Sequence, residues 1–140
     1  MPCAKILVVD DAEGFLEFCH LALKDKYEVI LARNGVECED LIRREKPDLV
    51  LLDIYLPRGN GLSLAEKFKA DKDLCHIPII LITGMVLDTD LPPGFWKMGT
   101  PADGFLTKPI DLGTLLTEVE KTLAKAHGID LSQQKTGGYL

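Results

Sequence analysis

The sequence predicts an α/β fold, a five-stranded parallel sheet with helices on both faces. Short apolar runs, too short to form helices, alternate along the chain with longer stretches in which apolar residues recur at helical spacing. The runs hold few polar residues, as expected for strands that are buried on both faces of a sheet. Five alternations of strand and helix favour parallel strands joined by crossover helices, with no internal repeat and no linker to a second domain.

The expected strands are the apolar runs at 5–9, 27–32, 49–52, 79–82 and 104–106. The run at 49–52 is the clearest, because it is wholly apolar, lies between Pro47 and Pro57, and is followed directly by Asp53. Turn-forming residues at 57–61 come next. We expect them to bring the backbone close to Asp53 before the next helix begins.

Helices are expected at about 13–24, 36–45 and 62–71, and from 112 onward. In the first of these, Phe15, Cys19 and Ala22 recur at helical spacing and predict the face that turns to the core. The last helix has the most regular apolar stripe, and Asp111 is placed to cap its first turn.

The composition is typical of a globular protein, with 46% hydrophobic and 27% charged residues. A chain of 140 residues fits one domain, which we expect at 1–127, followed by a flexible C-terminal tail at 128–140. The net charge of −6 argues against nucleic acid or an anionic membrane as partner. No run resembles a signal peptide or a membrane span, so a cytoplasmic location and reduced cysteines are expected.

Polar residues follow four of the five predicted strands, at the point where each strand ends. They are Asp10 and Asp11, Asp53, Thr83 and Lys108. Because parallel strands end at the same edge of a sheet, we expect these side chains to converge there. This is also the edge at which open α/β sheets bind their ligands.

Three carboxylates at one edge repel one another unless a cation lies among them. Mg²⁺ prefers oxygen ligands of this kind, whereas the lack of converging His or Cys disfavours zinc. Lys108 and Thr83 suit the oxygens of a phosphoryl group, and a carboxylate can attack phosphorus to give an aspartyl phosphate. Asp53, single and central, is the expected nucleophile, with Asp10 and Asp11 as the pair that holds the metal.

Each of these residues also has a simpler explanation. Asp10 or Asp11 can cap the first helix, Thr83 can be the last residue of a strand, and Lys108 can lie in a solvated turn. All of these explanations must hold together at one edge of the sheet for the site to be absent, and we therefore favour the site.

Four motifs in this chain are similar to those of the response-regulator receiver family of two-component signalling. They are ILVVDD at 6–11, LLDIYLPRGNGL at 51–62, PIILITG at 78–84 and DGFLTKP at 103–109. Any one of them is a weak signal, but the combination is specific. The resemblance covers residues 4 to about 126, and it implies the sheet order 2-1-3-4-5.

The resemblance implies roles for individual residues. Asp53 is the implied phosphoacceptor. Mg²⁺ is implied to be held by Asp10, Asp11, Asp53 and a backbone carbonyl of Tyr55, and the phosphoryl group by Thr83 and Lys108. For the switch, the resemblance implies that Phe105 rotates in response to Thr83, and that the Lys108-Pro109 peptide bond is cis.

The function that the resemblance implies is that of a stand-alone receiver. It accepts a phosphoryl group from the phosphohistidine of a partner kinase or phosphotransfer protein, and it signals to a further effector protein. Its only expected reactions are self-phosphotransfer and autodephosphorylation. Phosphorylation-dependent dimerisation stays open. Tyr55 and Met85, two residues after Asp53 and Thr83, predict slow loss of the phosphoryl group.

Two other functions are considered. One is an interaction module of the same fold that works without phosphorylation, because the segment at 85–103 departs from the regular fourth helix of the family and is rich in Pro and Gly. The other is a phosphatase of the haloacid-dehalogenase type. That family has a second Asp two residues after the nucleophile, where this chain has Tyr55.

Overall fold

The computed structural model describes residues 4–57, 59–84 and 102–126. Its main sheet has five parallel strands, β1 (Lys5–Val9), β2 (Glu28–Ala32), β3 (Leu49–Asp53), β6 (Ile79–Thr83) and β7 (Gly104–Thr107). They lie in the order β2-β1-β3-β6-β7. Counted along the chain within this sheet, the order is 2-1-3-4-5, so the predicted fold class and strand order are confirmed.

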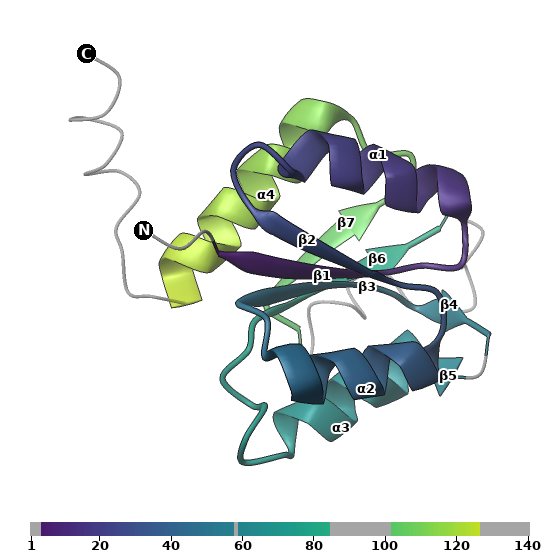
Figure 1. Ribbon diagram of the computed structural model, residues 1–140, viewed down its shortest axis with the longest axis vertical. Helices are drawn as coiled ribbons and strands as arrows, with labels where there is room; N and C mark the ends of the chain where they lie inside the picture. The colour runs from purple at the N-terminus through teal and green to yellow at the C-terminus, as the bar shows by residue number, and fades with distance from the viewer. Residues whose placement is uncertain (1–3, 58, 85–101, 127–140) are drawn as a thin grey trace.

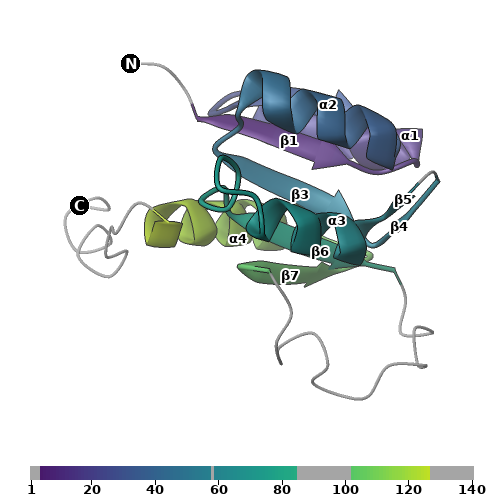
Figure 2. The same cartoon turned by 90° about the horizontal axis from the view of Figure 1, so that it is seen from below.

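Helices cover both faces of the sheet, as predicted (Figure 1). α1 (Glu13–Leu23) and α4 (Leu112–Ala126) lie on one face, and α2 (Gly35–Glu45) and α3 (Gly61–Lys69) lie on the other. Figure 2 shows α2 and α3 in front of the sheet, with α4 behind it. The observed helices begin and end within two residues of the expected positions, except at the end of the last helix, for which the sequence predicts no boundary.

The two faces of the sheet pack into two separate groups of buried side chains. Leu7, Val50 and Leu81 are among those that face α2 and α3, and they belong to the first core cluster. Val8 and Leu51 are among those that face α1 and α4, and they belong to the second core cluster. Successive residues of β3 and β6 thus point to opposite faces and all are buried, which explains why these two strands are unbroken apolar runs in the sequence.

A short hairpin follows β3 and was not predicted. It pairs β4 (Tyr55–Leu56) with β5 (Gly59–Asn60) in antiparallel register. Asn60 then caps α3, because its side-chain Oδ1 accepts hydrogen bonds from the backbone N–H groups of Leu62 and Ser63. Within the turn predicted at 57–61, residues 59–60 therefore form a strand of the hairpin, and Gly61 begins α3.

The predicted cap of the last helix is confirmed. Asp111 Oδ1 accepts a hydrogen bond of 2.7 Å from the backbone N–H of Thr114, in the first turn of α4. The predicted irregular fourth-helix region at 85–103 lies outside the described residues except for 102–103, and the predicted tail at 128–140 lies wholly outside them. Within the ranges that are described, no helix is both long and apolar enough to span a bilayer.

Candidate functional site

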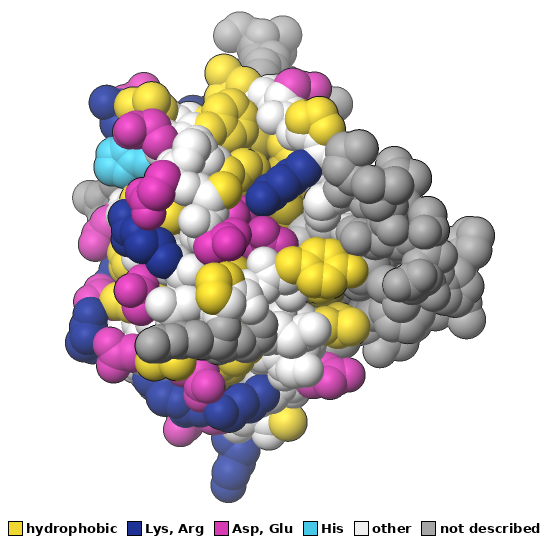
Figure 3. Space-filling view, turned by 90° about the vertical axis from the view of Figure 1, so that its right-hand side faces the viewer, with side chains coloured by type: hydrophobic (Ala, Val, Ile, Leu, Met, Phe, Trp, Pro, Cys, Tyr) yellow, Lys and Arg dark blue, Asp and Glu magenta, His cyan; other side chains and the backbone are white. Residues whose placement is uncertain are grey.

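The predicted site residues lie at the carboxyl edge of the sheet. Asp10 follows the last residue of β1, Asp53 is the last residue of β3, Thr83 is the last residue of β6, and Lys108 follows the last residue of β7. β1, β3, β6 and β7 are neighbours in the sheet. Figure 3 looks onto this edge and shows a group of acidic side chains, with a basic side chain next to it.

Three carboxylates meet at this edge. One oxygen atom from each of Asp10, Asp11 and Asp53 can be chosen so that all lie within 4.8 Å of one another. Asp10 is fully buried and Asp53 is buried, whereas Asp11 is exposed. The cluster is therefore closed on the side of the sheet and open to solvent on the side of Asp11.

Backbone contacts from the following loop hold Asp53 in place. The backbone N–H of Tyr55 donates a hydrogen bond of 3.1 Å to Asp53 Oδ1. Gly61 comes so close to Asp53 that a Cβ atom at this glycine would lie 2.1 Å from the Asp53 carbonyl oxygen. The Gly61 N–H donates to the Ile54 carbonyl at 2.8 Å. This is the close backbone approach that the turn residues at 57–61 predict, and only glycine fits it.

The two carboxylate oxygens of Asp10 have different surroundings. Oδ1 accepts a hydrogen bond of 2.9 Å from the backbone N–H of Ala12, so it supports the turn into α1. The simpler explanation, that Asp10 caps the first helix, is wrong, because the N-cap of α1 is Ala12 and no side chain makes a cap hydrogen bond there. Oδ2 is buried and accepts no hydrogen bond from any residue that the structure describes. The ammonium Nζ of Lys108 lies 2.6 Å from it as an ion pair.

Lys108 brings a positive charge into the acidic cluster. Besides its ion pair with Asp10, its Nζ lies 3.3 Å from Asp53 Oδ2. Its backbone N–H donates to the carbonyl of Thr83 at 2.9 Å, which ties the end of β7 to the end of β6. The Lys108-Pro109 peptide bond is cis, as the resemblance implies. Lys108 therefore lies within the site and not in a solvated turn.

Burial and like charge change the proton affinity of Asp53. Desolvation, followed by the charge of Asp10, raises the pKa of Asp53 from 3.8 to about 6. For Lys108, burial lowers the pKa, but the ion pair with Asp10 and the charge of Asp53 raise it by more, so the pKa lies above its ordinary value. The ammonium thus stays charged and offsets part of the carboxylate charge.

The residues present fit a divalent cation with oxygen ligands. The buried Oδ2 of Asp10 forms an ion pair with Lys108 but no hydrogen bond with the described residues. Two further carboxylates lie within reach of one ion, and no His or Cys belongs to this group. Mg²⁺ has this preference for carboxylate ligands at a site that stays open to water. A single lysine does not balance three carboxylates, and a divalent metal ion would supply the missing positive charge.

The remaining predicted residues surround the cluster. Thr83 is buried at the end of β6. Phe105, on β7, is partly buried against the first core cluster. Tyr55 is 55% exposed and lines an open hollow together with Asp11, Pro57 and Asn60.

One neighbour of the site was not predicted to have a functional role. The ring of Phe15, on α1, lies beneath the Lys108 ammonium, with 4.5 Å between Nζ and the ring centroid. Its helical spacing predicts only that the ring faces inward. The contact itself joins residues 93 positions apart, so no local pattern in the sequence indicates it.

Comparison with known proteins agrees with this geometry. The family model of the response regulator receiver domain matches residues 6–120. The chain belongs to the response regulator receiver family. Receivers are signalling modules of two-component systems, and phosphorylation and Mg²⁺ binding at an acidic pocket are typical of them.

Curated relatives of similar length support the assignment. Protein PilH of Pseudomonas aeruginosa is 35% identical over 122 residues, which cover 86% of this chain and 98% of PilH. The polar-differentiation response regulator DivK of Brucella anthropi is 33% identical over 126 residues, which cover 90% of this chain and all of DivK. Response regulator PleD of Caulobacter vibrioides is 35% identical, but the aligned region is only 30% of that protein.

Solved structures have the same fold. The CheY-like receiver domain protein of Methanospirillum hungatei superposes with a TM-score of 0.76 at 29% identity, covering 90% of this chain and 98% of the other. The chemotaxis response regulator CheY4 of Vibrio cholerae superposes with a TM-score of 0.74 at 25% identity, covering 86% of this chain and 98% of the other. The receiver fold thus extends over nearly all of the described residues.

Proposed function

We propose that this receiver takes a phosphoryl group from a partner's phosphohistidine onto Asp53, in a Mg²⁺-dependent reaction, and signals through contacts with other proteins. The observation that carries the proposal is the meeting of Asp10, Asp11 and Asp53 within 4.8 Å, with the Lys108 ammonium 3.3 Å from Asp53. A structural ion pair needs one carboxylate for one lysine. Three carboxylates are the arrangement expected for metal-assisted phosphoryl transfer.

In the proposed reaction, a carboxylate oxygen of Asp53 attacks phosphorus. The new P–O bond forms as the P–N bond to the donor imidazole breaks, and the imidazole nitrogen keeps the electron pair of that bond. Lys108 is placed to stabilise charge on the transferring group, since its ammonium already lies beside Asp53 Oδ2. A bound Mg²⁺ would supply further charge neutralisation, with Asp10, Asp11, Asp53 and the Tyr55 carbonyl as its proposed protein ligands.

The proposed switch begins at the phosphoryl group. The Thr83 hydroxyl would donate a hydrogen bond to a phosphoryl oxygen, and Phe105 would change rotamer in response. In support, β6 and β7 are neighbours, with Leu81 opposite Phe105 and Thr83 opposite Thr107. Pro109 is a further proposed residue of the switch, and its peptide bond with Lys108 is cis.

The proposed partners are a histidine kinase or a histidine phosphotransfer protein as donor and a separate effector protein as target. The proposed location is the cytoplasm. We propose no enzymatic activity apart from self-phosphotransfer and autodephosphorylation. A phosphorylation-dependent homodimer is a further outcome that size measurements before and after phosphorylation would detect.

Intact-protein mass spectrometry after incubation with acetyl phosphate and Mg²⁺ tests the proposal. We expect a gain of one phosphoryl group that disappears in Asp53→Asn and on removal of Mg²⁺. Asp40→Asn is a matched control, because Asp40 is an exposed carboxylate on α2 that pairs with Arg44. If Asp53→Asn gains the group as readily as the unmodified chain, another residue accepts it and the role proposed for Asp53 is wrong. If the unmodified chain gains no group, an interaction module that works without phosphorylation is favoured.

A further inference from the structure

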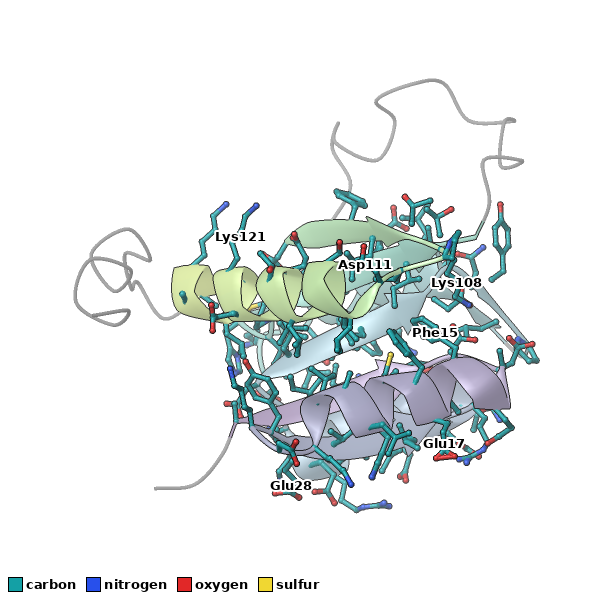
Figure 4. The ribbon with its side chains drawn as sticks, turned by 90° about the horizontal axis from the view of Figure 1, so that it is seen from above. Phe15, Glu17, Glu28, Lys108, Asp111 and Lys121 are labelled. Atoms are coloured by element: carbon teal, nitrogen blue, oxygen red, sulfur yellow. The ribbon has the colours of Figure 1, made fainter. Side chains whose placement is uncertain are left out.

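The Lys108 ammonium is held on three sides. Two of its neighbours are anionic oxygens, Asp10 Oδ2 at 2.6 Å and Asp53 Oδ2 at 3.3 Å. The third is the ring of Phe15, whose centroid lies 4.5 Å from Nζ. Figure 4 shows Phe15 reaching from α1 toward the end of the sheet where Lys108 lies. This distance is within the range in which a cation is attracted to the face of an aromatic ring.

The Phe15 ring is itself held in place. It lies in the first turn of α1, where its backbone N–H donates to the carbonyl of Ala12 at 3.1 Å. The loop that leads into this turn carries Asp10 and Asp11. The ring of Phe18 lies 6.2 Å from that of Phe15, and both rings are partly buried against the second core cluster. The ring and the acidic pair are thus positioned by the same short stretch of backbone.

A neutral ring affects Lys108 differently from a third carboxylate or a water molecule. It attracts the ammonium through its π electrons without adding negative charge to a cluster that already holds three carboxylates. It also excludes water from one side of Nζ. The attraction extends over the whole ring face, so Nζ can shift from Asp53 toward a phosphoryl oxygen and still remain over the ring.

We propose that Phe15 is a positioning residue for phosphoryl transfer, and that the π electrons of its ring hold the Lys108 ammonium next to Asp53. This inference rests on the proposed function, because the position of Lys108 affects the rate of phosphoryl transfer only if Asp53 accepts a phosphoryl group. Ordinary core packing is the competing explanation of Phe15. The experiment must therefore change the ring's electrons without changing its shape.

Fluorinated phenylalanines at position 15 make this separation. Mono-, tri- and pentafluorinated rings keep nearly the same shape but withdraw π electrons in steps. We expect the rate of phosphorylation by acetyl phosphate and Mg²⁺ to fall in the same order, reaching about fivefold for the pentafluorinated ring, the size of one partly buried cation–π contact. Phe15→Leu should be as slow as the pentafluorinated protein, and Phe15→Trp, which keeps a π face, should recover most of the rate.

Phe18 supplies the matched control, since it lies on the same helix and packs against the same core cluster. The same fluorinated series at Phe18 should leave the rate unchanged, and the thermal midpoint should be alike in both series. Equal rates across the Phe15 series would overturn the inference. So would a Phe18 series that declines as steeply, because the effect would then come from packing.

A measurement on the unphosphorylated protein distinguishes the inference about Phe15 from the proposed function. In the metal-free protein, the NMR resonances of the Lys108 side chain next to Nζ should carry an upfield ring-current shift that disappears in Phe15→Leu. If that shift is present but Asp53 accepts no phosphoryl group, the proposed function is wrong while the Phe15–Lys108 contact stands. If Asp53 is phosphorylated but the shift is absent, the inference about Phe15 is wrong.

Discussion

Two lysines at opposite edges of the sheet form ion pairs with aspartates and are buried to a similar degree. The side chain of Lys69 is 23% exposed and that of Lys108 is 25% exposed. Lys69, at the end of α3, donates from Nζ to Asp103 Oδ2 at 2.9 Å, to the Ile77 carbonyl at 2.9 Å and to the Cys75 carbonyl at 3.3 Å. Three acceptors thus meet the three donors of one ammonium.

The Lys69 ammonium has an acceptor for each of its three donors, whereas the surroundings of Lys108 carry excess negative charge. Asp103 Oδ2 also accepts a hydrogen bond from the backbone N–H of Ile79, so the Lys69 pair ties α3 to the start of β6 and to the residue before β7. Lys108 instead faces two carboxylates, and one of their buried oxygens accepts no hydrogen bond from the described residues. The ion pair of Lys69, in which the charges balance, therefore has a structural role. The excess negative charge beside Lys108 instead favours the binding of a further cation.

The largest effect on stability is expected where the backbone holds Asp53. In Gly61→Ala the new Cβ would overlap the Asp53 carbonyl oxygen, so we expect a loss of about 3 kcal/mol or more in unfolding free energy, together with a displaced carboxylate. Chemical denaturation would measure this loss.

Gly14→Ala is the matched control for Gly61→Ala. A Cβ at Gly14, within α1, meets no atom within 4 Å. We expect it to raise the unfolding free energy by about 0.5–1 kcal/mol, because alanine favours helix more than glycine does. A Gly61→Ala protein as stable as Gly14→Ala would show that the loop after β3 does not hold Asp53.

Replacing each of the two lysines with methionine tests the comparison directly. We expect Lys108→Met to slow phosphorylation about 100-fold, the usual cost of removing one donor that stabilises developing charge. We expect Lys69→Met to lower the unfolding free energy by about 1.5 kcal/mol, because hydrogen bonds from a charged donor to Asp103 and two carbonyls are lost.

Lys69→Met should also leave the phosphorylation rate of the folded protein unchanged. Rates are to be measured at a temperature where all variants are folded, and normalised to folded protein. A fall in rate as large as that of Lys108→Met would remove the distinction between the two edges.

The pH dependence of stability provides a smaller test. Because the pKa of Asp53 rises from 3.8 to about 6 on folding, the folded protein binds a proton that the unfolded chain releases between these values. Its stability should therefore increase as pH falls through 6. Without metal, we expect a gain of about 1–2 kcal/mol between about pH 7.5 and pH 5.

Asp53→Asn is the control for this pH effect, and it should remove most of the gain. Mg²⁺ should also remove it in the unmodified chain, since a bound cation favours the ionised carboxylate. The measurement should stay above about pH 5, because Asp71 and Asp111 have lowered pKa values and lose stabilising charge in more acidic solution. If the unfolding free energy of the metal-free protein stays constant or falls toward pH 5, the raised pKa of Asp53 is contradicted.

The smallest expected effect concerns loss of the phosphoryl group. The exposed Tyr55 side chain lines the hollow beside Asp11. Its position two residues after Asp53 predicts that it hinders the water that attacks the phosphoryl group. We expect Tyr55→Asn to shorten the phosphoryl half-life, followed as the decay of the modified mass after the donor is removed. A half-life that is unchanged or longer would contradict this role. The accompanying prediction for Met85 concerns a residue outside those that the structure describes.

Much of the fold could be predicted from sequence, because the strands are apolar on both faces and end in polar residues. The run at 49–52 and the acid that follows it show this most clearly, and β3 is buried at every position. The β4–β5 hairpin was missed, because two-residue strands carry no periodicity. The Asn60 cap was missed as well, although Asn is among the residues that favour such a position.

The sequence by itself determined which residues end each strand, and therefore which side chains share an edge, because polarity and periodicity are local properties of the chain. The tertiary structure decided how they meet. Lys108 lies between Asp10 and Asp53, the pKa of Asp53 is raised by burial, and Phe15 lies beneath the ammonium. These relations depend on the register of β1, β3, β6 and β7 and on the packing of α1 against the sheet. They join residues tens of positions apart, which no local pattern encodes.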